Sequence, residues 1–336
     1  MTRARPFRFG VFGENARTPE ALLDTAHRAE DSGFATLLIR DHFIEEPFGH
    51  QLAPLTALAT VAVATTRLRV GSLVLSNDYR HPVMLAKEIA TLDVLSGGRV
   101  ELGLGAGFSK AEYDGAGLPF DPPGVRVDRL EESIRVLKGL FGDKPLTFAG
   151  KHYAITNLDS YPKPVQRPHP PLLIGAAGKR MLSIAARKAD IIGFQTVSTA
   201  HGVMADDPSG RLAPAVTARV EQVRQVAGAR FDRIELSMVA TVVLAEERRP
   251  AAERFARERG WVASRPSRCS RCRPSSSGRS SKSSTRCARG ATGTASPTTS
   301  CSTAPCRLSR RLSDASPAHE RMSLEGSARA AGGFLG

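Results

Sequence analysis

Short apolar runs alternate with amphipathic, helix-spaced segments along residues 1–261, and this alternation constrains the fold more than any other feature of the chain. It is typical of βα units arranged around a parallel sheet. Seven strands are predicted, one fewer than a closed eight-stranded barrel requires. We therefore predict an α/β fold, a TIM-like (β/α)8 barrel that lacks its last helix–strand unit at the C-terminus. The predicted strands are 7–12, 36–40, 68–75, 99–104, 172–174, 191–195 and 235–244, and the predicted helices are 19–32, 52–65, 82–95, 125–140, 179–188, 216–226 and 250–261.

Two segments interrupt the alternation. Residues 146–171 contain two short β-like pieces and a proline-rich stretch, and we predict an insertion that carries a hairpin. Residues 196–213 form a long polar loop with glycine and proline, a type of loop that often covers an active site. The helix at 19–32 has Thr18 as its predicted N-cap and Gly33 as its stop signal.

The composition changes abruptly after Trp261. Between Trp261 and Leu308 the chain contains no Ile, Leu, Phe, Tyr or Met. Such a segment cannot bury enough apolar area to offset the entropy lost on ordering. We therefore predict two parts, a barrel domain at 1–261 and a disordered, low-complexity tail at 262–336.

The basic charge belongs to the tail. Of the formal net charge of +14, the 13 basic and 3 acidic residues after Trp261 contribute +10. The barrel domain is nearly balanced, so neither a nucleic acid nor an anionic membrane is an expected partner. All five cysteines also lie in the tail, with spacings that do not favour a metal site. A cysteine-free domain, with no evident signal peptide or membrane-spanning run, predicts a cytoplasmic protein.

We hypothesise that the tail is the product of a frameshift. One permissible set of codons, read two bases later, converts 269–272 into Phe-Glu-Met-Pro and converts 281–286 and 291–302 into an amphipathic helix and an aromatic, β-branched strand. These are the elements that the predicted barrel lacks. Under this hypothesis the chain as written is a non-catalytic, poorly folded remnant. An unbroken reading frame in independent DNA sequences around the Trp261 codon would contradict it.

Polar residues follow the second predicted strand at Asp41 and His42. In a parallel barrel the carboxyl ends of the strands carry the catalytic groups. A histidine there could exchange a proton with a ligand beside a bound ring, because imidazole titrates near neutral pH. The alternative is structural, with Asp41 capping a helix and His42 packing near the rim.

Glycine-rich turns follow two further strands. Gly103–Phe108 could let the backbone approach a ligand closely, or could simply make a tight turn at the rim. Gly175–Gly178 precede Lys179 and Arg180 at a helix start, where N–H groups and cations could cradle a phosphate. An ordinary turn is the alternative for this second segment as well. The first segment lacks the spacing of a dinucleotide-binding motif, and the second lacks that of a Walker motif. His81 precedes a proline at a helix start, which favours a structural cap over catalysis.

Together these segments resemble the luciferase-like monooxygenase superfamily over about residues 7–261. The resemblance is closest to the branch that uses the deazaflavin coenzyme F420, in which a hydride passes between a deazaflavin carbon and an organic substrate. The alternative is the FMN branch, whose members use O₂. The segments that carry the resemblance are Asp41–Phe43, Arg80–Pro82, Ala90–Asp93, Ser96–Arg99, Gly103–Phe108 and Pro171–Lys179.

The resemblance implies a role for each matching residue. His42 would be the catalytic residue, with Asp41 beside the deazaflavin ring. Leu73 and Val74 would lie where the family often has a bulge, sometimes with a strained peptide bond, against the back of the ring. The residues that would hold the cofactor tail and phosphate are Gly105, Ala106, Gly107, Gly175, Ala176, Ala177, Gly178 and Lys179.

The sequence departs from the sugar-phosphate dehydrogenases of this family at Phe108, where those enzymes carry a glutamate that serves as proton donor. The departure disfavours glucose 6-phosphate and leaves the general acid unassigned. The expected partner is therefore another small organic molecule, with no metal. A homodimer is also expected, as is usual in families of this kind.

Overall fold

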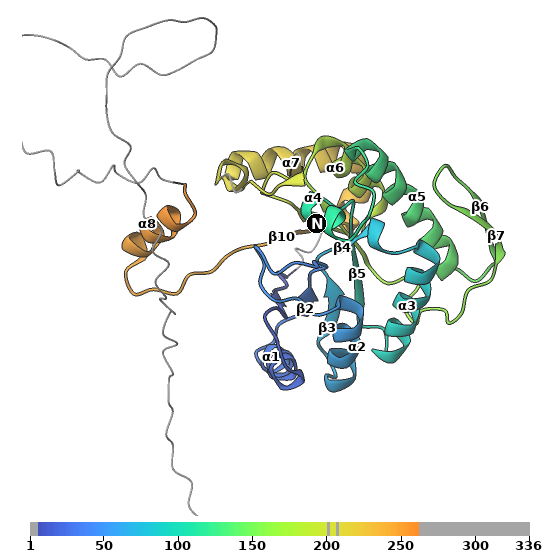
Figure 1. Cartoon of the computed structure of the whole chain (residues 1–336), viewed down its shortest axis with the longest axis horizontal. Helices are drawn as coiled ribbons and strands as arrows, with labels where there is room; N and C mark the ends of the chain where they lie inside the picture. The colour runs from blue at the N-terminus through green and yellow to red at the C-terminus, as the bar shows by residue number, and fades with distance from the viewer. Residues whose placement is uncertain (1–5, 200–201, 206–207, 262–336) are drawn as a thin grey trace, which may run out of the picture. The chain divides into compact units, whose positions relative to one another are not determined.

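The computed structural model describes residues 6–199, 202–205 and 208–261. Parallel strands form one curled sheet (Figure 1). A short strand β4 (Leu75–Ser76) follows β3 (Arg69–Ser72) along the chain and pairs with β5 (Val100–Gly105). Residues 262–336 lie outside the described residues, so the predicted disorder of the tail and the frameshift hypothesis remain predictions. In spatial order the strands are β1 (Gly10–Phe12), β2 (Thr36–Ile39), β3 (Arg69–Ser72), β5 (Val100–Gly105), β8 (Leu172–Ala176), β9 (Ile191–Phe194) and β10 (Glu235–Met238).

Helices follow the strands, as the sequence predicts. Neighbouring helices α1, α2 and α3 pack against one another in sequence order, and α6 packs against α7 (Figure 1). No helix in the described part of the chain is both long and apolar enough to cross a bilayer. The helices are α1 (Pro19–Asp31), α2 (Pro54–Ala64), α3 (Pro82–Leu95), α4 (Lys110–Gly115), α5 (Pro123–Phe141), α6 (Lys179–Lys188), α7 (Ala213–Ala227) and α8 (Arg248–Glu258).

Several local predictions are confirmed. The Thr18 side chain accepts a hydrogen bond from the Ala21 N–H at 3.3 Å and caps α1. Gly33, with φ of 78°, follows the end of that helix. The insertion contains the antiparallel hairpin of β6 (Leu146–Ala149) and β7 (Ala154–Leu158). All seven predicted strands are present.

Three predicted strands differ from the observed ones. The strand predicted at 7–12 begins only at Gly10, and Phe7 is 93% exposed. The strand predicted at 68–75 is interrupted between Ser72 and Leu75, where the Leu73–Val74 peptide bond is cis. The strand predicted at 235–244 ends at Met238, and Leu244 is 92% exposed. Strand β10 pairs with β9 on one side and with no described strand on the other. A run of β-branched residues needs neighbouring strands to pack against, so apolar sequence alone does not extend β10.

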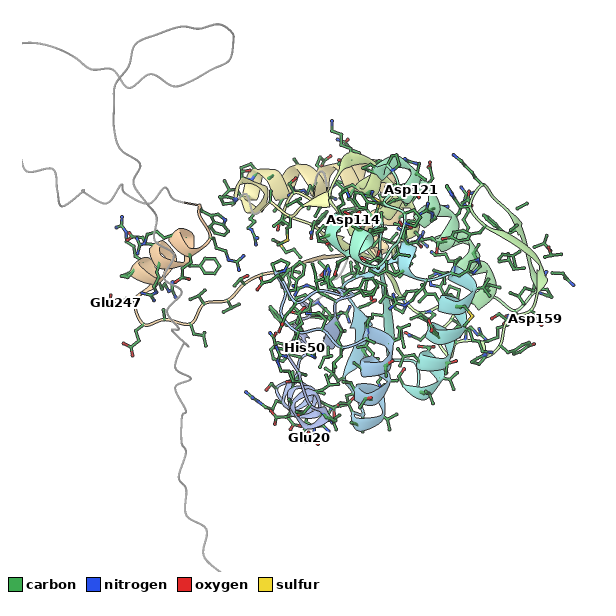
Figure 2. The ribbon with its side chains drawn as sticks, viewed as in Figure 1. Glu20, His50, Asp114, Asp121, Asp159 and Glu247 are labelled. Atoms are coloured by element: carbon green, nitrogen blue, oxygen red, sulfur yellow. The ribbon has the colours of Figure 1, made fainter. Side chains whose placement is uncertain are left out.

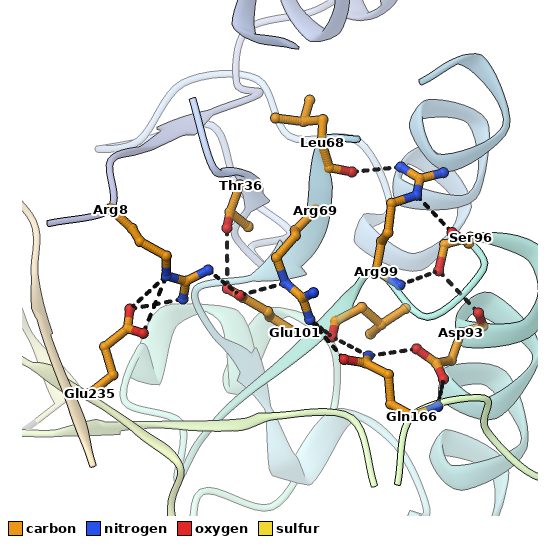
Figure 3. Close-up of polar contacts among 11 residues, drawn as sticks. Arg8, Thr36, Leu68, Arg69, Asp93, Ser96, Arg99, Glu101, Gln166 and Glu235 are labelled. Atoms are coloured by element: carbon orange, nitrogen blue, oxygen red, sulfur yellow. Dashed lines mark hydrogen bonds and ion pairs between the residues drawn. The ribbon is translucent and has the colours of Figure 1, made fainter. Parts of the chain in front are cut away.

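The sheet is open between β1 and β10, which are its edge strands within the described residues. Among the residues that the structure describes there are seven barrel strands, as predicted, and no eighth strand pairs with β1 or β10. A side chain nevertheless reaches across the opening at the amino ends of the strands. The guanidinium of Arg8, just before β1, donates to the carboxylate of Glu235, the first residue of β10, with a shortest distance of 2.8 Å (Figure 3).

A polar network holds the same end of the sheet together. Glu101 of β5 is 5% exposed and accepts hydrogen bonds from Arg8 and Arg69, each at 2.8 Å, and from Thr36 at 3.3 Å. Arg69 also donates to Gln166, in the segment before β8 (Figure 3). One carboxylate therefore links groups from β2, β3 and the approach to β1. The amino end of a parallel barrel is where such contacts serve stability.

Glu30 of α1 fixes the chain that enters β3. Its Oε1 accepts hydrogen bonds from the backbone N–H groups of Thr66 at 3.0 Å, Arg67 at 2.6 Å and Leu68 at 2.8 Å. Burial acts to raise the pKa of this carboxyl, but the three hydrogen bonds outweigh it and lower the pKa below its ordinary 4.5. The carboxylate therefore stabilises the fold above the unfolded-state pKa, and this contribution is lost as the pH falls through the lower folded-state pKa.

We expect Glu30→Gln to lower the free energy of unfolding by about 1 kcal/mol at neutral pH. The difference from the unsubstituted chain should shrink once the wild-type carboxylate is protonated in acid. Urea unfolding at neutral pH and over a series of acid pH values well below the ordinary carboxyl pKa of 4.5 measures both values. Asp24→Asn on the same helix is the control, because Asp24 faces Arg28 at 3.6 Å on an exposed surface. An equal loss at neutral and at acid pH would show that the charge of Glu30 is not what matters.

Candidate active site

The carboxyl ends of the strands surround a cavity of about 760 Å³. Small-molecule sites commonly occupy roughly 300–1,000 Å³. Three of the residues predicted to hold a cofactor do not line this cavity: Ala176 is buried in the core, and Gly178 and Lys179 are exposed at the start of α6. The structure thus gathers most, though not all, of the predicted site residues at one mouth. Those that line the cavity are Asp41, His42, Leu73, Val74, Gly105, Ala106, Gly107, Gly175 and Ala177.

Three glycines, two in β5 and one in β8, lie next to Val74. A Cβ atom on Gly103 would lie 3.2 Å from a Val74 methyl group, one on Gly105 would lie 2.7 Å away, and one on Gly175 would lie 3.4 Å away. On Gly103 it would also lie 1.9 Å from the Ser72 carbonyl oxygen. The Val74 side chain therefore requires a glycine at position 105, whereas at position 175 a Cβ atom would make an ordinary contact with it.

Asp41 connects β2 to the segment after β3. Its carboxylate accepts two hydrogen bonds from Arg80, at 2.6 and 3.0 Å, and one from the Ser76 N–H at 3.0 Å. The side chain is 3% exposed. The helix-capping alternative for Asp41 is wrong, because the next helix begins at Pro54 after an Ala53 N-cap. By contrast, His81 does cap a helix, since its Nδ1 accepts from the Val83 N–H at 3.3 Å.

His42 is held on three sides at the cavity wall. Its Nδ1 lies 3.0 Å from Oε2 of Glu112. Its ring stacks on Phe48 at a centroid distance of 4.4 Å and meets Phe108 edge-on at 5.9 Å. Because Nδ1 faces Glu112, Nε2 is the ring nitrogen that a ligand could contact. Of the two alternatives for His42, the geometry accommodates proton exchange, because the ring is fixed and lines the cavity.

Glu112 is a site residue that the sequence analysis missed. It lies in α4, the short helix that carries Asp114 in Figure 2, and its side chain is 1% exposed. It also accepts from the backbone N–H groups of Phe43 at 2.6 Å and Ile44 at 3.3 Å. Burial raises the pKa of Glu112, but the hydrogen bonds from His42 and the two N–H groups outweigh it and lower the pKa overall. A six-residue helix is too short for apolar periodicity to reveal.

A second buried ion pair lines the cavity. Arg40 is paired with Glu14, and its guanidinium lies 3.9 Å from the ring centre of Phe12 and 4.6 Å from that of Phe48. Burial raises the pKa of Glu14, and the nearby Arg40 only partly offsets it. No local motif marked either residue. Tyr79 also lines the cavity, and burial together with Glu112 raises its pKa, so the phenol stays protonated and donates to Glu112 at 3.3 Å.

The start of α6 has features that suit an anion. Gly178 is the N-cap and provides no side-chain capping bond, and a Cβ atom there would meet nothing within 4 Å. Lys179 is the first helical residue and is exposed. Arg180 is occupied by Asp128 and by the Gly124 carbonyl, so the predicted phosphate cradle retains one of its two cations. No cluster of three or more side chains that could bind a metal occurs among the described residues.

Comparison with known proteins identifies the family. A family model described as luciferase-like monooxygenase matches residues 5–304. The chain belongs to this family. The predicted resemblance is therefore confirmed, and the (β/α) barrel of luciferase-like proteins accounts for the parallel sheet and for the cavity at its carboxyl end.

Curated relatives within the luciferase-like family use two kinds of cofactor. An F420-dependent glucose-6-phosphate dehydrogenase of Nakamurella multipartita is 33% identical over 254 residues, which cover 74% of this chain and 71% of the relative. The enzyme of the same name from Microbacterium testaceum is 33% identical over 57% of each chain. An FMNH(2)-dependent dimethylsulfone monooxygenase of Pseudomonas putida is 29% identical over 65% of this chain and 56% of its own. The chain thus spans little more than half the length of the latter two relatives.

Solved structures of similar proteins show the same fold. The monooxygenase RslO1 from Streptomyces bottropensis has a TM-score of 0.61 at 23% identity and covers 75% of this chain and 77% of its own. An F420-dependent secondary alcohol dehydrogenase has a TM-score of 0.58 at 24% identity over 69% and 68% of the two chains.

Proposed function

We propose that this luciferase-like protein binds coenzyme F420 and transfers a hydride between it and a small organic substrate. The observation that carries the proposal is His42, which is fixed by the buried Glu112 and lines a cavity of about 760 Å³. A dehydrogenase that acts on an alcohol needs a group to take the hydroxyl proton, and a positioned histidine supplies one. The F420-dependent relatives, at 33% identity, favour this cofactor.

The residues present fit a ring-bearing, anionic cofactor. The apolar bulge of Leu73 and Val74 offers a surface for a flat ring at the cavity wall. The uncapped start of α6 and the Lys179 ammonium would hold an anionic tail, because backbone N–H groups and a cation favour negative charge there. When bound, F420 accepts or donates a hydride at a carbon of its deazaflavin ring.

The protein's own groups would then manage the proton. His42 would accept the hydroxyl proton of an alcohol at Nε2, and the Glu112 carboxylate at Nδ1 would stabilise the imidazolium that forms. Phe48 and Phe108 pack against the imidazole and would exclude water from it. The apolar Phe108 at this position favours a substrate other than a sugar phosphate.

FMN with O₂ is the second candidate, supported by the monooxygenase relative. As from the sequence, we propose a small molecule as the substrate and neither a nucleic acid nor a membrane as a partner. The nearly balanced charge of residues 1–261 supports that proposal. A homodimer stays a prediction.

Cofactor retention by the purified full chain tests the proposal. We expect F420, which absorbs near ~420 nm, to remain bound through gel filtration, and FMN, with its ~450 nm band, to be lost. Lys179→Ala should weaken F420 binding about tenfold, the effect of losing one charged contact. Lys188→Ala, at the other end of α6, is the matched control and should bind F420 normally. Retention of FMN alone would favour the monooxygenase, and retention of neither would favour the non-catalytic remnant.

A further inference from the structure

Glu112 makes contacts that extend beyond a simple ion pair. We propose that Glu112 is a positioning residue that keeps a proton on Nδ1 of His42 and so leaves Nε2 to face the substrate. The inference rests on the proposed function for its catalytic consequence, but its structural content concerns the imidazole alone. No motif in the sequence analysis pointed to this residue.

The hydrogen-bond donors around Glu112 determine where the proton of His42 lies. An ionised carboxylate only accepts hydrogen bonds, so every group that contacts it must donate. Oε1 receives the N–H groups of Phe43 and Ile44, and Oε2 receives the Tyr79 hydroxyl and His42 Nδ1. A neutral imidazole in this place must therefore carry its hydrogen on Nδ1, which makes Nε2 the acceptor.

The surroundings keep Glu112 ionised and His42 in this orientation. Four donors face the carboxylate, and two of them are backbone groups that cannot turn away. Phe48 lies against one face of the imidazole, and Phe108 meets it edge-on, which opposes rotation of the ring. Two pairs of charged groups near His42 are Glu14 with Arg40, which follow β1 and β2, and Asp41 with Arg80.

Substitution of Glu112 by glutamine removes the constraint while preserving size. A glutamine amide can donate to Nδ1 as well as accept from it, so the form with hydrogen on Nε2 becomes available. In that form Nε2 cannot accept the substrate proton. We expect kcat to fall about 10²- to 10³-fold, the usual contribution of a general base, while the KM for F420 stays within about twofold.

The experiment combines nitrogen NMR with kinetics on the full chain. Imidazole ¹⁵N shifts recorded without cofactor from about pH 6 to 9 distinguish a protonated Nδ1 from a protonated Nε2. His42→Asn identifies the His42 signal among the eight histidines. We expect hydrogen on Nδ1 in the unsubstituted chain and a population with hydrogen on Nε2 in Glu112→Gln.

Glu132→Gln is the matched control. Glu132 is another carboxylate that accepts three backbone N–H groups, those of Lys151, His152 and Tyr153, and it does not line the cavity. Its replacement should leave the His42 spectrum and kcat unchanged. Tyr79→Phe removes one other donor to Glu112 and should also leave hydrogen on Nδ1.

The possible outcomes separate this inference from the proposed function. An unprotonated Nδ1 in the neutral imidazole of the unsubstituted chain would overturn the inference, even if Glu112→Gln does not fold. An unchanged His42 spectrum and kcat in a folded Glu112→Gln would overturn it as well. Nδ1 protonation that depends on Glu112, in a chain that retains no F420, would support the inference and contradict the proposed function.

Discussion

Asparagine in place of His42 is expected to lower kcat for F420-dependent turnover by about 10²- to 10⁴-fold, because the group proposed to exchange the substrate proton is lost. The asparagine side chain can still donate to Glu112, so the buried carboxylate keeps a partner and the fold is retained. Binding of F420 should change by less than about threefold, since His42 does not hold the anionic tail. Steady-state kinetics and equilibrium titration with F420 measure the two quantities separately.

His50→Asn is the control for this substitution. His50 (Figure 2) lies in the same segment between β2 and α2 as His42 but does not line the cavity. Its backbone N–H donates to the Asn15 side chain at 3.0 Å. Its replacement should leave kcat unchanged. Full turnover by a folded His42→Asn variant would remove His42 from the proposed mechanism.

Gly103→Ala is expected to destabilise the fold by about 3 kcal/mol or more, beyond the usual cost of overpacking. The new methyl group would lie 1.9 Å from the Ser72 carbonyl oxygen, which is backbone, so a strand must move to admit it. That movement would also disturb the Ser72 hydroxyl, which lies 2.9 Å from the Gly103 carbonyl and 3.0 Å from its N–H. Urea denaturation measures the loss.

Gly115→Ala is the matched substitution. Gly115 is the last residue of α4, and a Cβ atom there would meet nothing within 4 Å. Alanine at this position should be neutral or stabilise the helix by about 0.5 kcal/mol. Similar losses for both variants would show that the crowding at Gly103 is relieved at little cost.

The barrel elements could be predicted because buried parallel strands and the helices between them differ in apolar pattern. The continuous run at Ile191–Phe194 and the amphipathic helix Lys179–Lys188 are examples, and both were found within a residue or two. The end of β10 could not be predicted, because it depends on whether another strand lies beside it. The sequence of residues 239–244 shows that they are apolar, but it does not show that β10 pairs with β9 alone among the described strands.

The candidate site was predicted in part. His42 stands directly after a strand, a position that marks it regardless of its partners. Glu112 could not be assigned to it, because 70 residues separate them in the chain and α4 has no periodicity to detect. The glycines around Gly103 were noticed, but the neighbours that require them follow from the three-dimensional course of the chain: the Ser72 carbonyl oxygen at Gly103 and Val74 at Gly105.

Three planar groups lie in series between the rim of the sheet and the imidazole of His42. The ring of Phe12, in edge strand β1, supports Arg40, which supports Phe48, which supports His42. The Arg40 guanidinium lies 3.9 Å from the ring centre of Phe12 and 4.6 Å from that of Phe48, so a displacement of one group would move the next. The imidazole proposed as the proton acceptor is thus linked through three ring or guanidinium contacts to β1, an edge strand among the described residues, so a shift of that strand would displace the groups that pack against His42.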